Sequence, residues 1–187
     1  YDYLNNEILF TFLQENNDFT ISYNELKQQF ISFYDYIPSM YISIGDMLLS
    51  TNTTLRSLYK HGVGKYNTFY GIKYPSYITF NLNPEPYFDC VFDNINYKSE
   101  VYLNNVDQSD ITLTDIQAYN DYQSTLLTPL VNNRNGNLRR RFRDWNAEIP
   151  RQGRNRVRGP WIKLLLQFDN SQNKKLILHD LLVQYTV

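Results

Sequence analysis

The sequence is poor in the residues that favour helices and in those that bind metals or form disulfides. Alanine occurs only at Ala118 and Ala147. Because alanine has the highest helix propensity, this scarcity argues against a helical bundle. The single cysteine, Cys90, excludes a disulfide within the chain and a cysteine-rich metal site. We therefore expect a buried, unpaired thiol at Cys90 and no metal or cofactor.

Long apolar segments are also missing. No run approaches the roughly 18 apolar residues that a membrane-spanning helix needs, so we expect no membrane span. No signal peptide is recognisable, and the first residue is Tyr1 rather than methionine. We expect the chain to be a cleavage product or the ordered part of a longer protein.

Aromatic residues, by contrast, are abundant. They make up 16% of the chain, with 17 Tyr and 11 Phe. Both side chains favour the half-buried pleated surface of a sheet, and Tyr is also common where proteins meet. Together with the scarcity of alanine, this composition predicts an all-β protein.

The first part of the chain contains short strand patterns about ten residues apart, separated by polar or glycine-containing turns. They occupy residues 7–12, 19–24, 29–37, 41–50 with an internal turn at Gly45-Asp46, and 57–71 as a hairpin. The pattern predicts an antiparallel meander, similar to one propeller blade, over residues 1–73. One blade cannot bury its own faces, so we expect this segment to pack on other polypeptide.

Residues 74–86 contain Pro75, Pro84 and Pro86 and mark a junction. A second series of strand patterns follows at 77–82, 88–103, 111–120, 137–149, 161–168 and 175–187. We expect a β-sandwich over residues 74–187. The nearly continuous apolar run WIKLLLQF (161–168) predicts a strand covered on both faces, and we expect it to form a hairpin with residues 175–187.

Positive charge is concentrated in residues 134–161, the arginine stretch, which holds nine of the ten arginines and both tryptophans. Residues 1–133 carry 15 acidic residues against six Lys/Arg, whereas residues 134–187 carry four against twelve. Such asymmetry concerns partners and docking rather than fold. In one continuous strand over 137–149, alternation places Arg139, Arg141, Arg143 and Trp145 on one face.

The arginine stretch has three interpretations. It contacts nucleic acid phosphates, with aromatic rings interleaved; it docks on an acidic protein surface, in the same chain or in a neighbouring copy; or it is a solvated sheet edge. The fork geometry of arginine and its stacking on aromatic rings favour protein docking. The candidate partner-binding residues are Arg139, Arg141, Arg143, Trp145, Arg151, Arg154, Arg156 and Arg158.

Catalytic signatures are missing. His61 and His179 lack a second ligand at metal-binding spacing, and no helix pattern follows Gly62-Val63-Gly64, so this segment is a turn and not a phosphate loop. A glycosidase needs only two facing carboxylates, but scattered acids on strands are usually surface residues, as we expect for Glu25, Asp35, Asp46, Asp89 and Asp93. We do not expect an enzyme.

Several segments carry a family resemblance, namely YNELKQQFISFYDYIP, LYKHGVGKYNTFYG, FDNINYKSE, AYNDYQST and RRRFRDWNAEIPR with the strands that follow it. Together they resemble the C-terminal part of the stabilisation or muzzle proteins, large tail proteins of crAss-like bacteriophages of gut bacteria. The resemblance extends from about Glu7 to the end of the chain. It implies a virion structural protein that closes the tail end and helps to retain packaged DNA through protein–protein assembly.

The resemblance also implies the partners. These are other phage tail proteins and copies of the chain in a ring, with packaged DNA met only indirectly, and assembly takes place in the bacterial host cytoplasm. The resemblance carries over no catalytic residues. The alternative is a lectin-like, carbohydrate-binding β-sandwich whose Tyr and Trp rings stack on sugars, and a glycan hydrolase comes third because no acid pair can be named.

Overall fold

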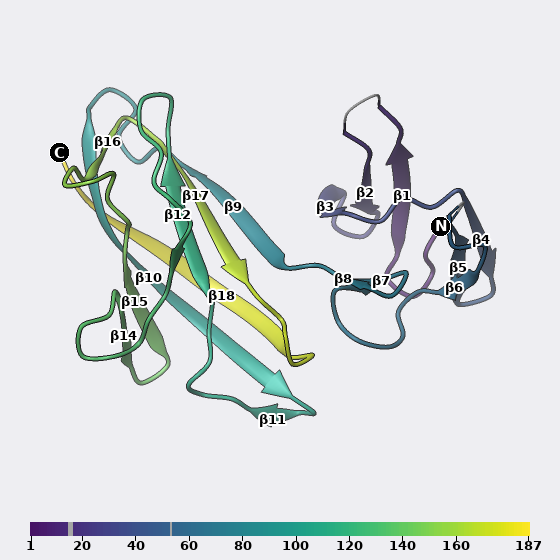
Figure 1. The fold of residues 1–187 in the computed structure, drawn as a ribbon. Coiled ribbons are helices and arrows are strands. Elements are labelled where there is room, and N and C mark those ends of the chain that lie inside the picture. Colours follow the sequence, from purple (N-terminus) through teal and green to yellow (C-terminus); the bar gives the residue numbers. More distant parts are fainter. Residues whose placement is uncertain (15–16, 53) are drawn as a thin grey trace. The chain divides into compact units, whose positions relative to one another are not determined.

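The computed structural model describes residues 1–14, 17–52 and 54–187. Within them the chain forms strands, turns and loops but no helix, so the predicted all-β class is confirmed. The same residues accordingly contain no helix that could cross a membrane. The chain divides into two compact units, Tyr1–Tyr74 and Pro75–Val187, coloured from purple to teal and from teal to yellow in Figure 1.

The N-terminal unit is built from short antiparallel strands that follow one another along the chain. They are β1 (Glu7–Phe12), β2 (Phe19–Asn24), β3 (Gln29–Tyr34), β4 (Met40–Ile44), β5 (Met47–Thr51), β6 (Leu58–Lys60), β7 (Thr68–Phe69) and β8 (Ile72–Lys73). They form the sheets β1-β2-β3, β4-β5-β6 and β7-β8. The strands thus follow the order of a meander, but they are divided among separate sheets, whereas a single blade would join them into one.

The turn between β4 and β5 lies where the sequence predicted it. Ile44 pairs with Met47, which leaves Gly45 and Asp46 as the turn residues. Gly45 has a φ of 59°, which is expected at the first position of a type II′ turn. The predicted hairpin within residues 57–71 is wrong, because β6 pairs with β5 and β7 with β8. The residues between β6 and β7 form a longer loop instead of a tight turn.

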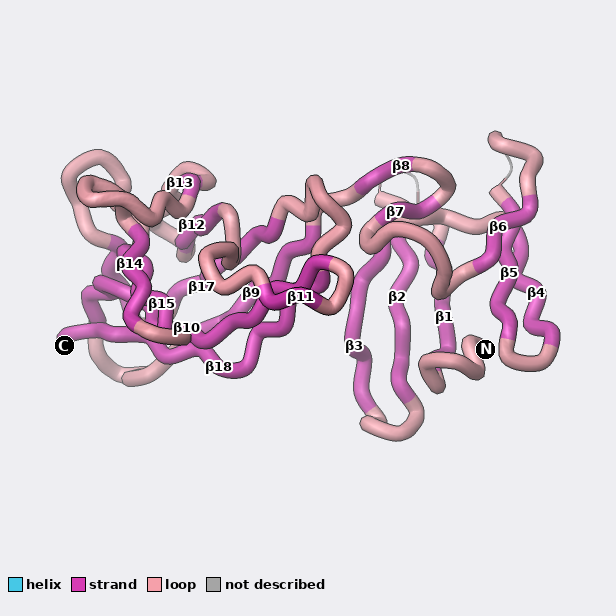
Figure 2. The backbone as a smooth tube through the Cα atoms, turned by 90° about the horizontal axis from the view of Figure 1, so that it is seen from below, coloured by secondary structure: helices cyan, strands magenta, loops and turns pink. Residues whose placement is uncertain are grey.

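The C-terminal unit is a two-layered β structure. Its strands are β9 (Ser76–Leu82), β10 (Cys90–Leu103), β11 (Val106–Asp107), β12 (Asp115–Tyr119), β13 (Thr128–Pro129), β14 (Leu138–Arg141), β15 (Asp144–Glu148), β16 (Val157–Gly159), β17 (Ile162–Phe168) and β18 (Lys175–Thr186). One sheet has the order β11-β10-β15-β14, with β16 and β18 also on β10, and the other has the order β13-β12-β17-β9. In Figure 2 the strands β12 and β13 lie above β10 and β18.

The core of this unit lies between the two sheets. β10 contributes Phe92, Ile95 and Tyr97, and the opposite sheet contributes Ile116 and the buried face of β17. Alternation along β10 slips between Phe92 and Asn94, where the pairing with β18 shifts register, so that Phe92 and Ile95 both reach the core. Cys90 is completely buried and is a free thiol, as predicted.

The last two strands do not form the predicted hairpin. β17 pairs with β9 and β12, whereas β18 pairs with β10 from Thr186↔Val91 to Lys175↔Tyr102. The loop between β17 and β18 therefore crosses from one sheet to the other. Because the partner of β18 lies far away in the sequence, no local pattern revealed it.

β17 is also buried more on one side than predicted. Its alternate residues Ile162, Leu164, Leu166 and Phe168 are buried in the core, while the residues between them are half-buried. The expectation of complete cover on both faces is therefore wrong. β17 runs in the middle of its sheet between β9 and β12, and its outer side chains face away from the opposing sheet.

Replacing Leu164 by alanine should lower the free energy of unfolding by about 2–5 kcal/mol, because the substitution leaves a cavity in the core. Leu164 has no exposed surface, and it lies opposite Ala118 and Phe80 on the neighbouring strands. The matched control is Leu165→Ala on the half-buried face, which should cost clearly less. Chemical denaturation followed by tryptophan fluorescence measures both values. Equal losses for the two variants would contradict the one-sided burial of β17.

Candidate functional site

The arginine stretch begins as a hairpin and not as the single strand that the sequence predicted. Arg141 pairs with Asp144 across a turn formed by Phe142 and Arg143, and Phe142 has a φ of 58°. The predicted shared face of Arg139, Arg141, Arg143 and Trp145 is therefore wrong, because the chain reverses before Trp145. The sequence did not predict this turn, because the turn contains neither glycine nor asparagine.

Arg140 is the arginine that lies against Trp145. Its guanidinium carbon lies 5.6 Å from the centre of the Trp145 ring, as in a cation–π contact. Its Nη1 is 2.5 Å from Oδ1 of Asp110, and its Nε donates to the carbonyl of Phe142. Trp145 itself is only 2% exposed, so both residues stabilise the hairpin. Arg140 was absent from the predicted set because alternation placed it on the opposite face.

Arg139 has a structural role as well. Its guanidinium donates hydrogen bonds to backbone carbonyls of the loop that leads into β14, those of Asn133, Arg134 and Gly136, and to that of Leu138, where β14 begins. Backbone carbonyls at a loop need donors, and Arg139 supplies them here. We infer that this side chain is committed to the loop and not free for a partner.

Other arginines pair with acids of the same unit. Arg143 lies 3.7 Å from Glu100, Arg156 lies 2.7 Å from Asp93, and Arg158 lies 3.7 Å from Asp89. These acids belong to the acid-rich part of the sequence, yet they fold beside the arginines.

The charge asymmetry of the sequence therefore does not separate the two units. The N-terminal unit has seven acidic residues against five Lys/Arg, a net of −2, and the C-terminal unit has twelve against thirteen, a net of +1. Positive and negative charges also alternate on the outer face of the sheet that contains β10. There Arg141, Asp144, Lys98 and Asp180 lie side by side on β14, β15, β10 and β18, and Lys98 is 3.8 Å and 4.0 Å from the two carboxylates.

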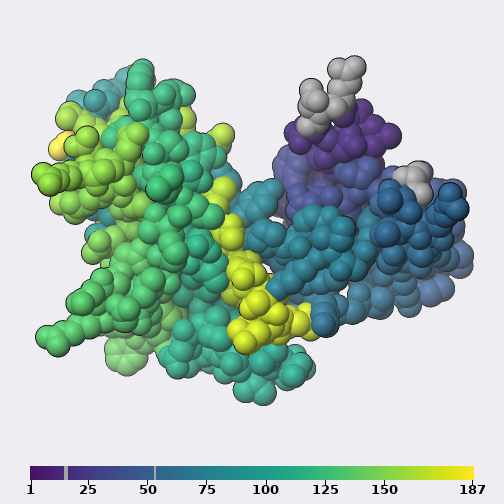
Figure 3. All heavy atoms as spheres, viewed as in Figure 1, coloured from purple at the N-terminus to yellow at the C-terminus, as the bar shows by residue number. Residues whose placement is uncertain are grey.

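The remaining predicted arginines are not engaged by an acid of the described fold. Arg141, Arg151 and Arg154 are exposed. They make no ion pair within 4.0 Å with any residue that the structure describes. In Figure 3 the arginine stretch, in green to yellow-green, covers part of the surface of the C-terminal unit. The arginines of the predicted set are all exposed, and they differ in whether they already pair with groups of the fold.

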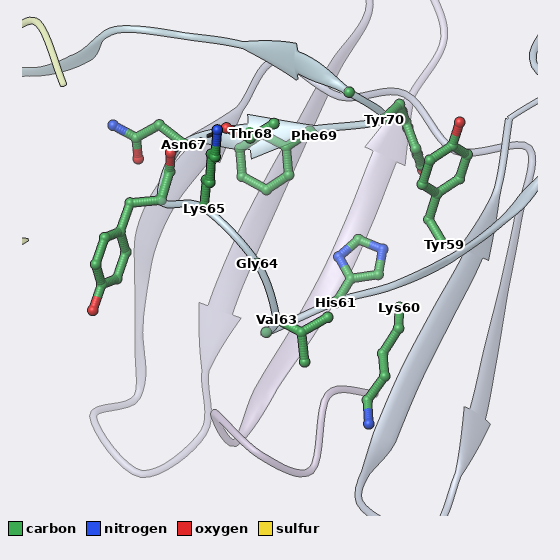
Figure 4. Close-up of a pocket in the computed structure, with 13 residues that line it drawn as sticks. Tyr59, Lys60, His61, Val63, Gly64, Lys65, Asn67, Thr68, Phe69 and Tyr70 are labelled. Carbon is green, nitrogen blue, oxygen red and sulfur yellow. Dashed lines mark hydrogen bonds between the residues drawn. The ribbon is translucent and has the colours of Figure 1, made fainter. Parts of the chain in front are cut away.

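A pocket in the N-terminal unit is a second candidate site. It has a volume of about 320 Å³ and is lined by residues 59–71, and Figure 4 shows His61 below Tyr70 and Tyr59. Nε2 of His61 lies 2.6 Å from Oγ of Ser50, which lies 2.7 Å from the hydroxyl of Tyr70. Ser50 has no exposed surface, so this Ser–His contact cannot present a nucleophile to a substrate. Burial lowers the pKa of His61, which favours the neutral imidazole.

The other chemically interesting residues also stay apart. Within residues 1–14, 17–52 and 54–187, no three His, Cys, Asp or Glu side chains gather as a metal site would require. His179 lies on the exposed side of β18, with Nε2 3.5 Å from Glu100. It therefore belongs to the surface of the sheet and not to a metal site.

Comparison with known proteins shows the family. Residues 1–54 match the sequence model of the crassvirus muzzle protein, and residues 64–152 match that of the crassvirus muzzle protein C-terminal domain. The muzzle protein of Bacteroides phage crAss001 is 29% identical over 192 aligned residues, which cover 99% of this chain and 13% of that protein.

These matches are all to muzzle proteins of bacteriophages. The chain belongs to the crassvirus muzzle protein family. The resemblance seen in the sequence is therefore confirmed. The chain spans about 13% of the length of the curated relative that it matches. The C-terminal domain match includes the β14–β15 hairpin and ends within the arginine stretch.

Charge reversal should affect stability at Arg139 but not at Arg141. Arg139→Glu should lower the free energy of unfolding by roughly 1 kcal/mol or more, because it removes the donor of several hydrogen bonds to the loop. Arg141→Glu should leave stability nearly unchanged, since exposed charges contribute little. Thermal melting of both variants provides the comparison, and equal melting temperatures would argue against the loop-holding role of Arg139.

The N-terminal unit should lose stability as the pH falls below about 6.5, the pKa of a histidine in an unfolded chain. The folded state lowers the pKa of His61, so protons bind the unfolded state more readily and favour unfolding. Melting at pH 7.5 and pH 5.5 should show this loss, and His61→Gln should reduce it. Burial raises the pKa of Glu7, so this residue makes the folded state more stable as the pH falls. It does so equally in the wild-type chain and in the His61→Gln variant. An unchanged pH dependence in the variant would exclude His61 as the cause.

Proposed function

We propose that the chain is a structural part of the phage tail that helps to close the tail end and retain packaged DNA through protein–protein assembly. Its partners would be other tail proteins and copies of itself in a ring, with packaged DNA met only indirectly. Assembly would take place in the bacterial host cytoplasm, and the role would be structural rather than enzymatic. Family membership supports the virion part of this proposal, and the name of the muzzle protein of phage crAss001 suits a part that closes an opening.

The observation that carries the assembly role is the outward side of the sheet β1-β2-β3. Residues that pair across antiparallel strands share a face, and the pairings Ile21↔Phe10, Ile21↔Phe33, Phe19↔Phe12, Tyr23↔Ile8 and Tyr23↔Phe30 define one continuous side. We call it the aromatic face, and it consists of Ile8, Phe10, Phe12, Phe19, Ile21, Tyr23, Phe30 and Phe33. Ring contacts link it across the strands, with Phe19 5.1 Å from Phe12 and 5.8 Å from Phe33.

The opposite side of the same sheet is polar and buried. Thr20 and Ser22 have no exposed surface, and Asn24 is only 7% exposed. Thr20 Oγ1 donates to the carbonyl of Tyr36, and Asn24 Nδ2 donates to the carbonyl of Asn5. The sheet therefore turns its polar side inward and leaves Phe30 and Phe33 61% and 70% exposed. Exposed apolar patches of this kind mark surfaces that another protein covers.

The composition of the aromatic face favours a protein partner over a sugar. Aromatic rings can stack on sugars, but a glycan site also needs placed hydrogen-bonding groups. Tyr23 supplies the only side-chain polar atom of the aromatic face. An apolar surface of another tail polypeptide is the better match for the aromatic face. Because this face carries no positive charge, it is also a poor match for the phosphates of DNA.

We further propose that the exposed arginines serve the same assembly. Arg141, Arg151 and Arg154 would meet carboxylates of a partner directly. Arg143, Arg156 and Arg158, which already pair with acids of their own unit, would contact the same partner. Arg139 and Trp145 would hold the hairpin in shape. The segments 1–73 and 74–187 would act as separate domains in this assembly.

Replacing Phe30 and Phe33 by serine should abolish self-association of the recombinant chain. The wild-type chain should associate as its concentration rises and should bind a hydrophobic dye, because the aromatic face is uncovered. The double variant should stay monomeric with little change in melting temperature, since both rings are already exposed. Analytical sedimentation and dye fluorescence measure the effect.

The matched control is Leu182→Ser, which removes a side chain 67% exposed on β18, a strand that is not part of the aromatic face. It should leave the association unchanged. A wild-type chain that stays monomeric without binding the dye would contradict the assembly role of this face. Labelling the chain in purified virions tests the tail location separately, and a signal anywhere other than the tail end would refute closure.

A further inference from the structure

A groove on the C-terminal unit combines the later part of the arginine stretch with an exposed aromatic ring. Its volume is about 700 Å³, and one of its walls is the segment that runs into β16. The other side is the turn after β12, where Tyr122 is 85% exposed. The side chains that line it and enter the argument are Asp89, Tyr122, Gln123, Arg154, Arg156 and Arg158.

Hydrogen bonds hold the two walls of this groove together. Gln123 Nε2 donates to the carbonyl of Arg156, and Oε1 of the same side chain accepts from the backbone N–H of Arg158, at 3.2 Å and 2.8 Å. Asn120 Nδ2 donates to the carbonyl of Arg158 at 2.9 Å. Oδ1 of Asn120 accepts from the backbone N–H groups of Tyr122 and Gln123, which fixes the turn that presents Tyr122. The groove is therefore preorganised, so that ligand binding does not include the free-energy cost of ordering it.

The arginines of the groove differ in how far their charge is already used. Arg156 is engaged by Asp93 at 2.7 Å, and Arg158 lies 3.7 Å from Asp89. Arg154 makes no ion pair with any residue of the described chain. The groove thus offers one unpaired guanidinium and two partly neutralised ones, beside an exposed tyrosine ring.

We propose that this groove binds an acidic segment of another virion polypeptide, with a carboxylate on Arg154 and an apolar side chain against Tyr122. The proposal rests on the assembly function above and identifies the partner chemistry for the arginines. A guanidinium pairs with a carboxylate in a two-pronged geometry, and tyrosine gives apolar contact area together with a polar tip.

The same groove is a poor match for duplex DNA. Asp89 and Asp93 lie beside its arginines and would repel phosphates. A DNA-binding domain usually carries a strong excess of positive charge, whereas the C-terminal unit has a net charge of +1. One free guanidinium would release few counterions, so any DNA binding should have a shallow salt dependence.

Photo-crosslinking in assembled virions tests the proposal. Tyr122 is replaced by p-benzoylphenylalanine in the phage-encoded protein that carries this chain, and purified virions are irradiated, digested and analysed by mass spectrometry. We expect a crosslink to another virion polypeptide next to Asp or Glu. A crosslink to packaged DNA, a crosslink within residues 1–74 of the same chain, or no crosslink would each overturn the proposal.

Charge variants give a second readout. Arg154→Glu should lower the crosslink yield at position 122 by about tenfold or more, as loss of a charged hydrogen-bonded pair would, whereas Arg154→Lys should retain part of it. The control is Arg134→Glu, an exposed arginine of the same stretch outside the groove, which should leave the yield unchanged. Equal yields for the Arg154→Glu and Arg134→Glu variants would overturn the proposal.

Binding of the recombinant chain to duplex DNA over a salt series tests the competing ligand. We expect weak binding, and a plot of the logarithm of the binding constant against the logarithm of the salt concentration should have a slope of magnitude below about 2. A steep slope that Arg154→Glu abolishes would assign the groove to phosphate and overturn the proposal. If the chain lies at the tail end but gives no crosslink from position 122, this inference fails while the proposed function stands. If the chain is absent from the tail end, both fail.

Discussion

The C-terminal unit depends on the pairing of β10 with strands that come much later in the chain. β15 and β16 lie along one of its edges and β18 along the other, the last over almost its whole length. Each of these pairings closes a long loop, and the entropy cost of closing it is repaid only when the buried faces of both sheets meet. The arginine hairpin and the groove beside β16 keep their geometry because both are anchored on β10.

The N-terminal unit follows a different principle. Its interior includes polar side chains such as Thr20 and Asn24, held by hydrogen bonds to the backbone, and an aromatic cluster in which Tyr36 packs 4.5 Å from Phe69. Its most apolar sheet surface faces outward. Such outward phenylalanine rings stay in contact with water unless another polypeptide surface covers them.

Charge connects these observations. A count along the chain gives an acidic part and a basic part, but folding places Asp89, Asp93 and Glu100 beside arginines of the basic part. Exposed pairs of this kind add little stability. They do leave a nearly neutral surface that carries a few unpaired guanidinium groups, such as that of Arg154. A surface of this kind is better suited to pairing with single carboxylates than to binding the many phosphates of DNA.

The sequence by itself determined the all-β class, the strands over residues 7–12 and 19–24, the turn at Gly45 and the burial of Cys90. It also determined the family, because these depend on local alternation, turn chemistry and residue pattern. Only the tertiary structure decided that β18 joins β10 and not β17, and that Arg140 rather than Arg141 lies over Trp145. It also decided that Arg139 serves a loop and that the phenylalanines of β3 face outward. In each case the deciding contact joins residues whose proximity depends on strand register and chain reversal, and local alternation does not encode either.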